Sequence, residues 1–261
     1  MTKRTSIAVA VLSLGVLGAC GSSLGYVEFA SATSTRVDDL NAQTLTPNSS
    51  STSQVTGELN RLADTLDLGV RSGTINAART QVALNGGGTI DLTGVADYAR
   101  FFDLQQSGVA PTRGIIGIPT RAGNMPKSNT GTYNGVTRVT VQDGLDLYDL
   151  DGTATATANF GLGTLNVVLD NLDGTQSTLT GSGSVTDVAT ITVNNAIITG
   201  NTASGGTASL SSASINNGNG FSGSQGVQHE AGFYGPSADE VGGVLLVDDN
   251  SVQVFADYLT D

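Results

Sequence analysis

The sequence predicts an all-β protein: an antiparallel up-and-down β-barrel of about eight strands, preceded by a less regular N-terminal region with one short helix. Glycine contributes 35 of the 261 residues, about twice its usual share, and suits tight turns. Charged residues make up only 13%, far fewer than a helical bundle or coiled coil needs. In the second half of the chain, apolar residues alternate with Thr, Ser and Asn, which is the period of a half-buried strand.

The N-terminus has the features of an export signal. A basic start precedes an apolar run from Ile7 to Leu17, which is too short to span a bilayer and suits a secretory signal. The following Leu-Gly-Ala-Cys, ending at Cys20, matches the bacterial lipobox, in which the cysteine is acylated and becomes the mature N-terminus. The alternative is a plain signal peptide with an incidental cysteine. We predict a lipoprotein signal peptide over residues 1–19, a palmitate-bearing Cys20 and membrane attachment through the lipid anchor only.

The residue after the cysteine indicates the destination. Gly21 is not the aspartate that is associated with inner-membrane retention, so we expect the outer membrane and the face toward the cell exterior. The single cysteine also means that no disulfide can form, in a compartment that permits them.

The next two segments have weaker patterns. Residues 20–53 are rich in Ser, Thr and Asn and predict a lipidated flexible tether, with one short strand over Tyr26–Phe29. Residues 54–127 form the less regular N-terminal region. Apolar residues at helical spacing between Val55 and Leu66 predict one short helix there.

Strands are expected in the rest of that region. Val82–Leu84 and Ile90–Leu92 flank a glycine-rich turn, which is typical of a hairpin. Two further strands are predicted over Tyr98–Leu104 and Gly114–Ile118.

Residues 128–261 carry the sustained strand pattern and are assigned to the C-terminal β-barrel. Thr153–Phe160 alternates strictly, with small apolar groups on the even positions. Asp170–Gly174 and Asn194-Asn195 are interpreted as turns between strands. Closure into a barrel would remove the exposed strand edges that invite aggregation.

Charge excludes one class of partner. The net charge is −12, and from Val139 to Asp261 there are 14 acidic residues and no Lys or Arg. Such a surface repels phosphate backbones, so we expect no nucleic-acid partner.

The motifs that suggest catalysis or metal binding lack their structural context. Gly218–Gly223 matches the dinucleotide fingerprint, but no helical pattern follows to receive a pyrophosphate. His229 is the only histidine, and with one cysteine the chain cannot assemble a zinc site. Asp146, Asp149 and Asp151 do not have the spacing of a helix–loop–helix calcium site. The sequence therefore predicts no enzyme activity, no cofactor and no metal.

One segment is specific enough to suggest a family. Ala231 to Gly243 reads Ala-Gly-Phe-Tyr-Gly-Pro-Ser-Ala-Asp-Glu-Val-Gly-Gly, and it resembles the signature of the transferrin-binding protein B barrel family, which includes the factor-H-binding lipoproteins of Neisseria. Gly114–Thr120 and Gly131–Gly135 are similar to stretches of small family members. The resemblance covers residues 95–261 and agrees with the lipobox.

The motif residues are expected to specify the fold and not to contact a ligand. Phe233 and Tyr234 must point to opposite faces of a strand, so we predict Phe233 as the core plug and Tyr234 toward the surface. Ser237–Glu240 is expected to form one helical turn over the barrel end. The motif residues are Gly232, Phe233, Tyr234, Gly235, Pro236, Glu240, Gly242 and Gly243.

The resemblance implies a function in binding. It indicates a small, single-barrel, monomeric lipoprotein on the cell surface that captures a host protein or an iron or haem source, and thus a role in iron acquisition. The alternative is a structural envelope lipoprotein without a dedicated ligand. A shared fold does not identify the ligand.

Overall fold

The computed structural model describes residues 24–34, 50–60, 65–67, 71–78, 80–94, 96–107, 112–221, 226–249 and 252–261. The predicted signal peptide and Cys20 lie outside these residues. The all-β prediction is confirmed: apart from two short 3₁₀ turns, the regular elements of the described residues are strands. These turns are η2 (Ala122–Asn124) and η3 (Ile215–Gly218). No helix in the described part of the chain is long and apolar enough to cross a membrane.

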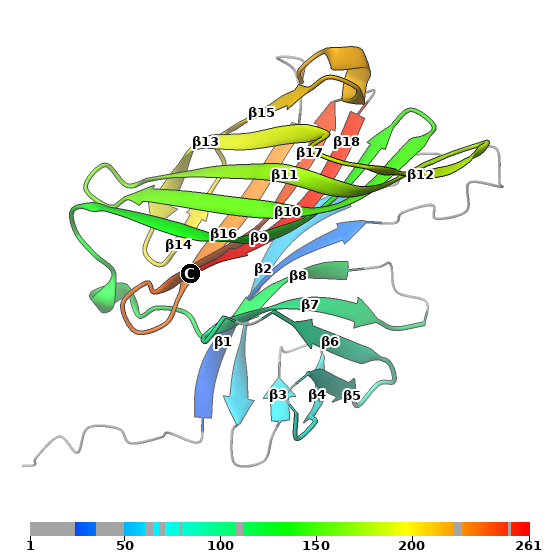
Figure 1. The fold of residues 1–261 in the computed structure, drawn as a ribbon. Coiled ribbons are helices and arrows are strands. Elements are labelled where there is room, and N and C mark those ends of the chain that lie inside the picture. The colour runs from blue at the N-terminus through cyan, green and yellow to red at the C-terminus, as the bar shows by residue number, and fades with distance from the viewer. Residues whose placement is uncertain are drawn as a thin grey trace, which may run out of the picture.

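The first eight strands close into a barrel of their own (Figure 1, blue to green). Each strand pairs antiparallel with the next, and β8 returns to pair with β1. The predicted hairpin around Asn85–Gly88 and the two strands after it are confirmed. The strands are β1 (Leu24–Ser34), β2 (Ser50–Asn60), β3 (Thr65–Asp67), β4 (Ser72–Ile75), β5 (Gln81–Leu84), β6 (Thr89–Thr93), β7 (Ala99–Gln105) and β8 (Thr112–Gly117).

This closed barrel corrects the prediction of a less regular N-terminal region with one short helix. The segment from Val55 to Leu66, expected as a helix, lies in β2 and β3 wherever it is described. Val55 and Leu59 are four residues apart, a spacing that satisfies both a helix and two periods of a strand. The tether expected over residues 20–53 is likewise wrong for Leu24–Ser34, which pairs along its whole length with β2.

The remaining ten strands form a second sheet, which is also closed. Its order is β12-β11-β10-β9-β18-β17-β16-β14-β13-β15, and an additional pairing of β11 with β13 completes a ring. Eight of the ten strands form that ring, because β12 and β15 lie outside the β11–β13 pairing that closes it. The strands are β9 (Thr130–Asp143), β10 (Asp146–Asn159), β11 (Thr164–Thr178), β12 (Gly181–Val185), β13 (Ala189–Thr199), β14 (Thr202–Ser204), β15 (Thr207–Ser212), β16 (Gly226–Tyr234), β17 (Glu240–Asp249) and β18 (Val252–Thr260).

Two predicted turns are instead bulges within continuous strands. Asn171 lies inside β11 with φ +52°, and Asn195 lies inside β13 with φ +58°. Asparagine tolerates this left-handed conformation better than most residues do. One such residue inserts an extra position, which changes the face that later side chains occupy without reversing the chain.

The interior of the second barrel is filled by small and branched side chains. Ala154, Ala156 and Ala158 of β10 are buried, as the strict alternation of that segment predicted. Ile215 of η3 is fully buried in the same core cluster. Phe233 also belongs to this cluster, so side chains fill the interior as they do in other small barrels.

Candidate functional site

The two barrels meet along β16, β17 and β18 of the second and β1, β2, β7 and β8 of the first. Nine of the ten residues of β17 are buried, whereas a strand with one face in water would alternate. Val244 and Leu246 have side chains on the outer face of this strand and are nonetheless buried. The outer faces of β16–β18 therefore form a junction with the first barrel.

Phe233 and Tyr234 point into different compartments, as neighbours on a strand must. Phe233 lies inside the second barrel, with its ring centroid 5.6 Å from that of Phe160. Tyr234 is fully buried in a separate cluster with Phe101, Ile115 and other apolar residues of both barrels. The placement of Phe233 in the core is confirmed. The expectation that Tyr234 faces the surface is wrong, because the first barrel covers that face.

Two glycines of the motif are needed for the chain to fit here. A Cβ on Gly242 would lie 2.8 Å from Cγ2 of Ile115 in the first barrel, closer than real Cβ contacts. Gly235 has φ +85°, which a residue with a side chain rarely adopts, and it begins the turn between β16 and β17. Gly232 and Gly243 lie against the hydroxyl ends of Tyr234 and Tyr258.

The turn after Gly235 is not the single helical turn that the sequence predicted. Ala238 has φ +62°, which lies outside the helical region. The Asp239 carboxylate instead accepts the backbone N–H of Ser237, two residues earlier in the chain, at 3.1 Å, and the Asp239 N–H donates to the Tyr234 carbonyl at 2.9 Å across the turn. Pro236 is exposed, and its carbonyl accepts a hydrogen bond from Asn124 Nδ2 at 3.1 Å.

The three stretches that resemble the family converge on this turn. Thr120, at the end of the first stretch, donates its hydroxyl to the Gly235 carbonyl at 2.7 Å and accepts the Ala238 N–H at 3.2 Å. Tyr133, in the second stretch, donates its hydroxyl to the Ala238 carbonyl at 2.9 Å. The signature thus has a structural basis: its separate parts hold one turn and one inter-barrel contact.

Glu240 joins the barrels through its carboxylate. Oε1 accepts the backbone N–H of Asp97 at 2.5 Å and of Tyr98 at 2.9 Å, and Oε2 accepts that of Ala99 at 2.8 Å. Burial raises the pKa of the Glu240 carboxyl, and the three N–H donors oppose that rise. The side chain therefore satisfies three backbone donors at the start of β7.

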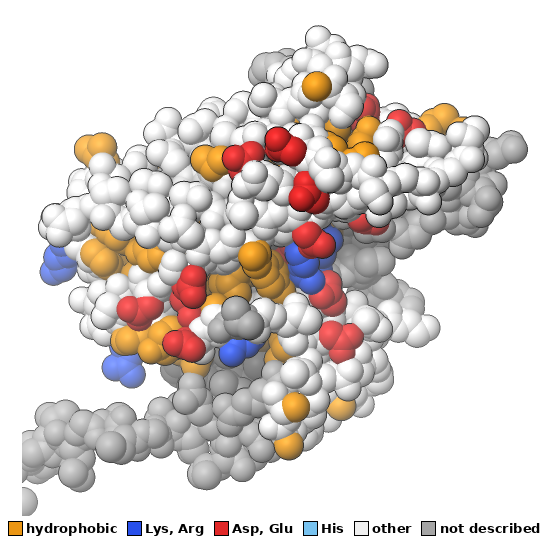
Figure 2. All heavy atoms as spheres, in the orientation of Figure 1, with side chains coloured by type: hydrophobic (Ala, Val, Ile, Leu, Met, Phe, Trp, Pro, Cys, Tyr) orange, Lys and Arg blue, Asp and Glu red, His pale blue; other side chains and the backbone are white. Residues whose placement is uncertain are grey.

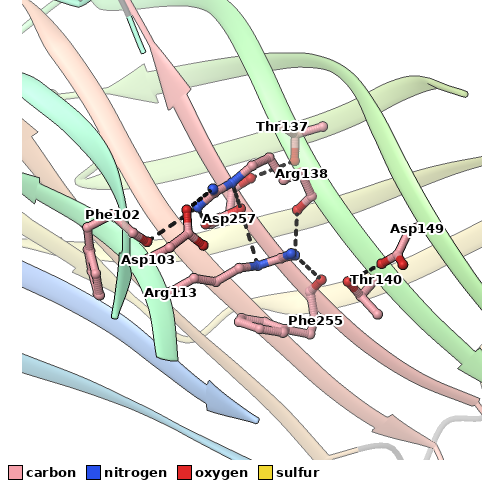
Figure 3. A network of polar contacts seen from close by, with 9 residues as sticks. All are labelled: Phe102, Asp103, Arg113, Thr137, Arg138, Thr140, Asp149, Phe255 and Asp257. Atoms are coloured by element: carbon pink, nitrogen blue, oxygen red, sulfur yellow. Dashed lines mark hydrogen bonds and ion pairs between the residues drawn. The ribbon is translucent and has the colours of Figure 1, made fainter. Parts of the chain in front are cut away.

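A charged network crosses the same junction (Figure 3). The Asp257 carboxylate, on the outer face of β18, is fully buried and lies between two arginines. Arg138 binds it through both Nε and Nη2 and binds Asp103 of β7 through Nη1 at 2.6 Å. Arg113 of β8 places its Nε 3.7 Å from Asp257 Oδ1. Two cations thus compensate one buried anion, as buried charges require.

Aromatic rings complete the surroundings of both arginines. The Arg138 guanidinium carbon lies 4.6 Å from the centre of the Phe101 ring, and that of Arg113 lies 4.2 Å from the centre of the Phe255 ring. Burial lowers the pKa of Arg138, but the carboxylates of Asp257 and Asp103 more than offset this and raise it overall. No local sequence pattern predicts this network, although Arg138 is the last basic residue before the acidic half of the chain.

His229 lies inside the second barrel and not in a solvated loop. Its Nε2 is 2.8 Å from the Tyr258 hydroxyl, and its Nδ1 is 3.2 Å from the Gly205 carbonyl. Burial lowers the pKa of His229 to about 4, against the raising effect of the Gly205 hydrogen bond. The imidazole is neutral at pH 7. A neutral ring with Nδ1–H donating to Gly205 and Nε2 accepting from Tyr258 satisfies every partner.

The acidic residues that sequence analysis weighed for calcium are engaged in other contacts. Asp146 accepts a hydrogen bond from Gln176 at 3.0 Å, and Asp149 accepts one from Thr140 at 3.1 Å. Asp151 is exposed and pairs in register with Asp173 of β11. Over the described ranges, no group of three or more His, Cys, Asp or Glu side chains is arranged to hold a metal ion.

The family profile described as the C-lobe and N-lobe β-barrels of Tf-binding protein B matches residues 125–258, just over half of the chain. The chain belongs to this family. Its match begins at the linker before β9 and covers nearly all of the second barrel, including the turn between β16 and β17, but none of the first barrel.

Solved transferrin-binding protein B structures share the fold. That of Haemophilus parasuis, a double mutant, has a TM-score of 0.57 and 21% identity over 90% of this chain and 44% of that one. The intact N- and C-lobe protein named Ap-TbpB has a TM-score of 0.54 and 19% identity, over 90% of this chain and 46% of that one. The Neisseria meningitidis isotype 1 protein has a TM-score of 0.52 and 16% identity, over 90% of this chain and 43% of that one. This chain therefore spans less than half the length of these proteins. No curated protein matches it by sequence.

One end of the family barrel carries apolar side chains that nothing described covers. Leu162, in the turn between β10 and β11, is 77% exposed, and Ile197 of β13 is 56% exposed. They are neighbours, because Ile197 pairs in register with Thr164, two residues after Leu162. The Leu162 N–H donates to Asn159 Oδ1 at 2.9 Å, which fixes the turn.

The bulge at Asn195 exposes Ile197. Before it, odd residues such as Ile191 and Val193 point into the barrel; after it, the even residue Ala196 does. If the strand alternated strictly through Asn195, with no bulge, the odd-numbered Ile197 would point into the barrel. Because the bulge at Asn195 places the side chain of Ile197 in solvent, we take this end of the barrel as the candidate interaction surface. The sequence did not predict this surface, because Asn194-Asn195 was interpreted as a turn.

Proposed function

We propose that this protein is a lipid-anchored binding protein of the outer cell surface, attached through Cys20, that captures an iron- or haem-carrying host protein. Family membership supports a binding protein and not an enzyme. The relatives with the same fold are named for binding transferrin, and this chain has the barrel without the full length of those proteins. These relatives therefore support a class of ligand, an iron- or haem-carrying host protein, and not one particular protein.

The observation that carries the proposal is the exposed pair Leu162 and Ile197 at one barrel end. Figure 2 shows that the visible face of the second barrel is mostly white, that is, uncharged polar side chains and backbone, with separate small hydrophobic groups. Apolar side chains grouped on a polar surface are typical of protein-binding sites. Within the family motif, by contrast, Phe233 is buried in the barrel core and Tyr234 and Glu240 are buried in the junction, so these side chains are not available to a ligand.

A binding assay with a matched control tests the surface. The full chain is immobilised in lipid vesicles and exposed separately to iron-loaded transferrin, haemoglobin and free haem. Leu162→Ser with Ile197→Ser should weaken capture of one protein probe at least about tenfold. The control is Leu179→Ser, which removes an exposed leucine in the turn between β11 and β12, at 50% exposure against 56% for Ile197, and should leave capture unchanged.

Two outcomes would contradict the proposal. If none of the three probes binds the wild-type protein, the alternative of a structural envelope lipoprotein gains support. If a probe binds and both variants retain it, the binding surface lies elsewhere on the barrel.

The anchor is tested independently. Cys20→Ser should leave an uncleaved precursor and move the protein from the detergent phase to the aqueous phase, because the acyl chains supply the membrane affinity. Unchanged partitioning would contradict lipidation at this cysteine.

A further inference from the structure

Two exposed leucines lie at the end of the second barrel opposite Leu162, because Leu145 precedes β10 and Leu162 follows it. Leu145 occupies the two-residue turn between β9 and β10 and is 45% exposed. Leu179 occupies the two-residue turn between β11 and β12 and is 50% exposed. Turns of this length favour glycine, asparagine and aspartate, so neither leucine is explained by the turn that holds it.

The two turns are neighbours. Leu147 of β10 pairs in register with Ser177 of β11, and each exposed leucine lies two residues beyond that pair. Two residues extend about 7 Å at most, so the Cα atoms of Leu145 and Leu179 lie within about 20 Å of each other. Figure 1 shows both hairpins leaving the second barrel at the same end, in its upper right. One segment of a partner protein can therefore contact both leucines.

Carboxylates border these leucines. Asp143 and Asp146 flank the β9–β10 turn directly. Asp248 is exposed near the end of β17, and the β17–β18 turn lies beside Asp143 because Val252 of β18 pairs with Asp143. Figure 2 shows hydrophobic and acidic side chains together at this end, in its upper right. The apolar contact area thus has an acidic border.

The hydrogen bonds of the two flanking aspartates leave their charge uncompensated. Asp143 accepts the backbone N–H of Asn216 at 2.7 Å, and Asp146 accepts the side-chain amide of Gln176 at 3.0 Å, so both donors are neutral. No ion pair in the described part of the chain involves either carboxylate, and the chain has no Lys or Arg beyond residue 138. Burial, followed by the charges of Asp146 and Asp143, raises the pKa of the Tyr148 hydroxyl.

We propose that the end of the second barrel that carries Leu145 and Leu179 binds a protein segment whose apolar side chains are bordered by lysine or arginine. The leucines supply apolar contact area, as exposed apolar groups with a polar border do at protein interfaces. The carboxylates select a cationic border, because opposite potentials steer association and like charges suppress other partners.

This surface differs in chemistry from the end that carries Leu162 and Ile197. Residues 152–169 and 188–229, which include that pair, contain no Asp, Glu, Lys or Arg. The two surfaces lie at opposite ends of β10, so Leu179→Ser changes one of them and remains a control for the other.

The carboxylates disfavour two other occupants. A second copy of this chain, with a net charge of −12, would bring aspartates against aspartates. Insertion of the leucines into a lipid surface would desolvate Asp143 and Asp146, and anionic lipids would repel them. A cationic protein segment is the occupant whose charge complements the border.

Three synthetic helical peptides of equal length test the surface: one of leucine and lysine, one with glutamate in place of lysine, and one with serine in place of leucine. Their affinity for the immobilised full chain is measured by surface plasmon resonance at low and high salt. The leucine–lysine peptide should bind at least about tenfold more tightly than either of the others, and its affinity should fall with rising salt.

Two double variants separate the apolar and the charged contributions. Leu145→Ser with Leu179→Ser should weaken binding of the leucine–lysine peptide at least about tenfold. Asp143→Asn with Asp146→Asn keeps an acceptor oxygen for each hydrogen bond, so it should weaken binding and reduce the salt dependence. The matched control is Val136→Ser, which removes a 53% exposed valine near the start of β9 and should leave peptide binding unchanged. Unchanged thermal unfolding of each variant excludes loss of the fold as the cause.

Three results would overturn the proposal. The first is equal binding of the three peptides, or equal effects of the leucine variant and the Val136→Ser control. The second is leucine-dependent binding of the Cys20→Ser chain to phosphatidylcholine vesicles, with or without phosphatidylglycerol, which would assign this end to a lipid surface. The third is a dimer of the Cys20→Ser chain in sedimentation that is lost in the leucine variant, which would assign this end to a second copy.

Discussion

The two barrels of this protein are closed in the same way but are stabilised differently. The first combines two strands of 11 residues with short ones, such as β3 with three residues and β4 with four. Among the side chains described there, which exclude those of β1 and β2, its own buried cluster has five residues: Val82, Ile90, Phe102, Leu104 and Ile116. The second has strands of up to 15 residues around one large core cluster. Burial of apolar area is the main favourable term in folding, so we expect the large core of the second barrel to make a major contribution to stability.

The junction compensates for this difference. Ala99, Phe101 and Ile115 of the first barrel are buried against Tyr234 and Leu259 of the second, and not inside their own ring. These described residues of β7 and β8 are therefore buried by the neighbouring barrel.

The largest expected effects come from the two neighbouring aromatics of the motif. Phe233→Ala should destabilise the second barrel by about 3–5 kcal/mol, because it leaves a cavity in that core. Tyr234→Ala should cost a similar amount but act on the junction, so the first barrel should unfold at a lower denaturant concentration than the second. Guanidinium unfolding followed by site-specific probes in each barrel distinguishes the two. Identical transitions in both variants would contradict the division of roles.

Acid should destabilise the second barrel through His229. Its native pKa is about 4, whereas the unfolded value is about 6.5, so the unfolded state binds more protons between these values. The contribution is complete above pH 6.5 and is lost as the pH falls toward 4, amounting to roughly 3 kcal/mol.

The control for this prediction is His229→Gln, whose stability should change less between pH 7 and pH 5. Burial raises the pKa of both Glu230 and Glu240, which makes stability fall as pH rises and so acts in the opposite direction. The comparison of variant with wild type is therefore the measurement. Parallel pH curves for the two proteins would contradict the assignment to His229.

Removing the buried Asp257 carboxylate of the junction should increase the difference in stability between the two barrels. Asp257→Ala leaves Arg113 and Arg138 without their shared partner and should cost about 3 kcal/mol, the low end for a buried pair because the arginines are 17% and 22% exposed. Asp257→Asn preserves the shape and should cost less. Equal losses from both substitutions would show that packing, and not charge, makes the contribution.

A smaller effect is expected at Glu240. Glu240→Gln retains one oxygen for the three backbone donors of residues 97–99 and should cost about 1.5–3 kcal/mol, the range for hydrogen bonds to a charged group. Hydrogen exchange at Tyr98 and Ala99 should accelerate in this variant more than at the β10–β11 pairs. Unchanged exchange at Tyr98 and Ala99 would show that the carboxylate does not hold that loop.

The sequence predicted the second barrel well because its alternation is long and regular. The small even-numbered residues Ala154, Ala156 and Ala158 point inward as expected, and Phe233 lies in the core. The prediction from sequence failed where one local pattern is compatible with two structures. Four-residue spacing from Val55 suits a helix or a strand, and the asparagines at 171 and 195 suit a turn or a bulge.

The junction could not be predicted from the sequence at all. The burial of Tyr234 and the partners of Asp257 depend on where a separate barrel docks, which no local pattern encodes. The contact between Glu240 and residues 97–99 joins positions more than 140 apart in the chain. The family motif was recognised as structural, but its structural task became clear only when both barrels were in place.

Native-state hydrogen exchange of the full chain, in wild type and Asp257→Asn, tests most directly whether the first barrel depends on the junction while the second stands on its own core. With increasing guanidinium, amides of β5–β8 should lose protection together, before those of β9–β11, and Asp257→Asn should widen that gap. Simultaneous loss of protection in both barrels, with no change of the gap in the variant, would contradict the account.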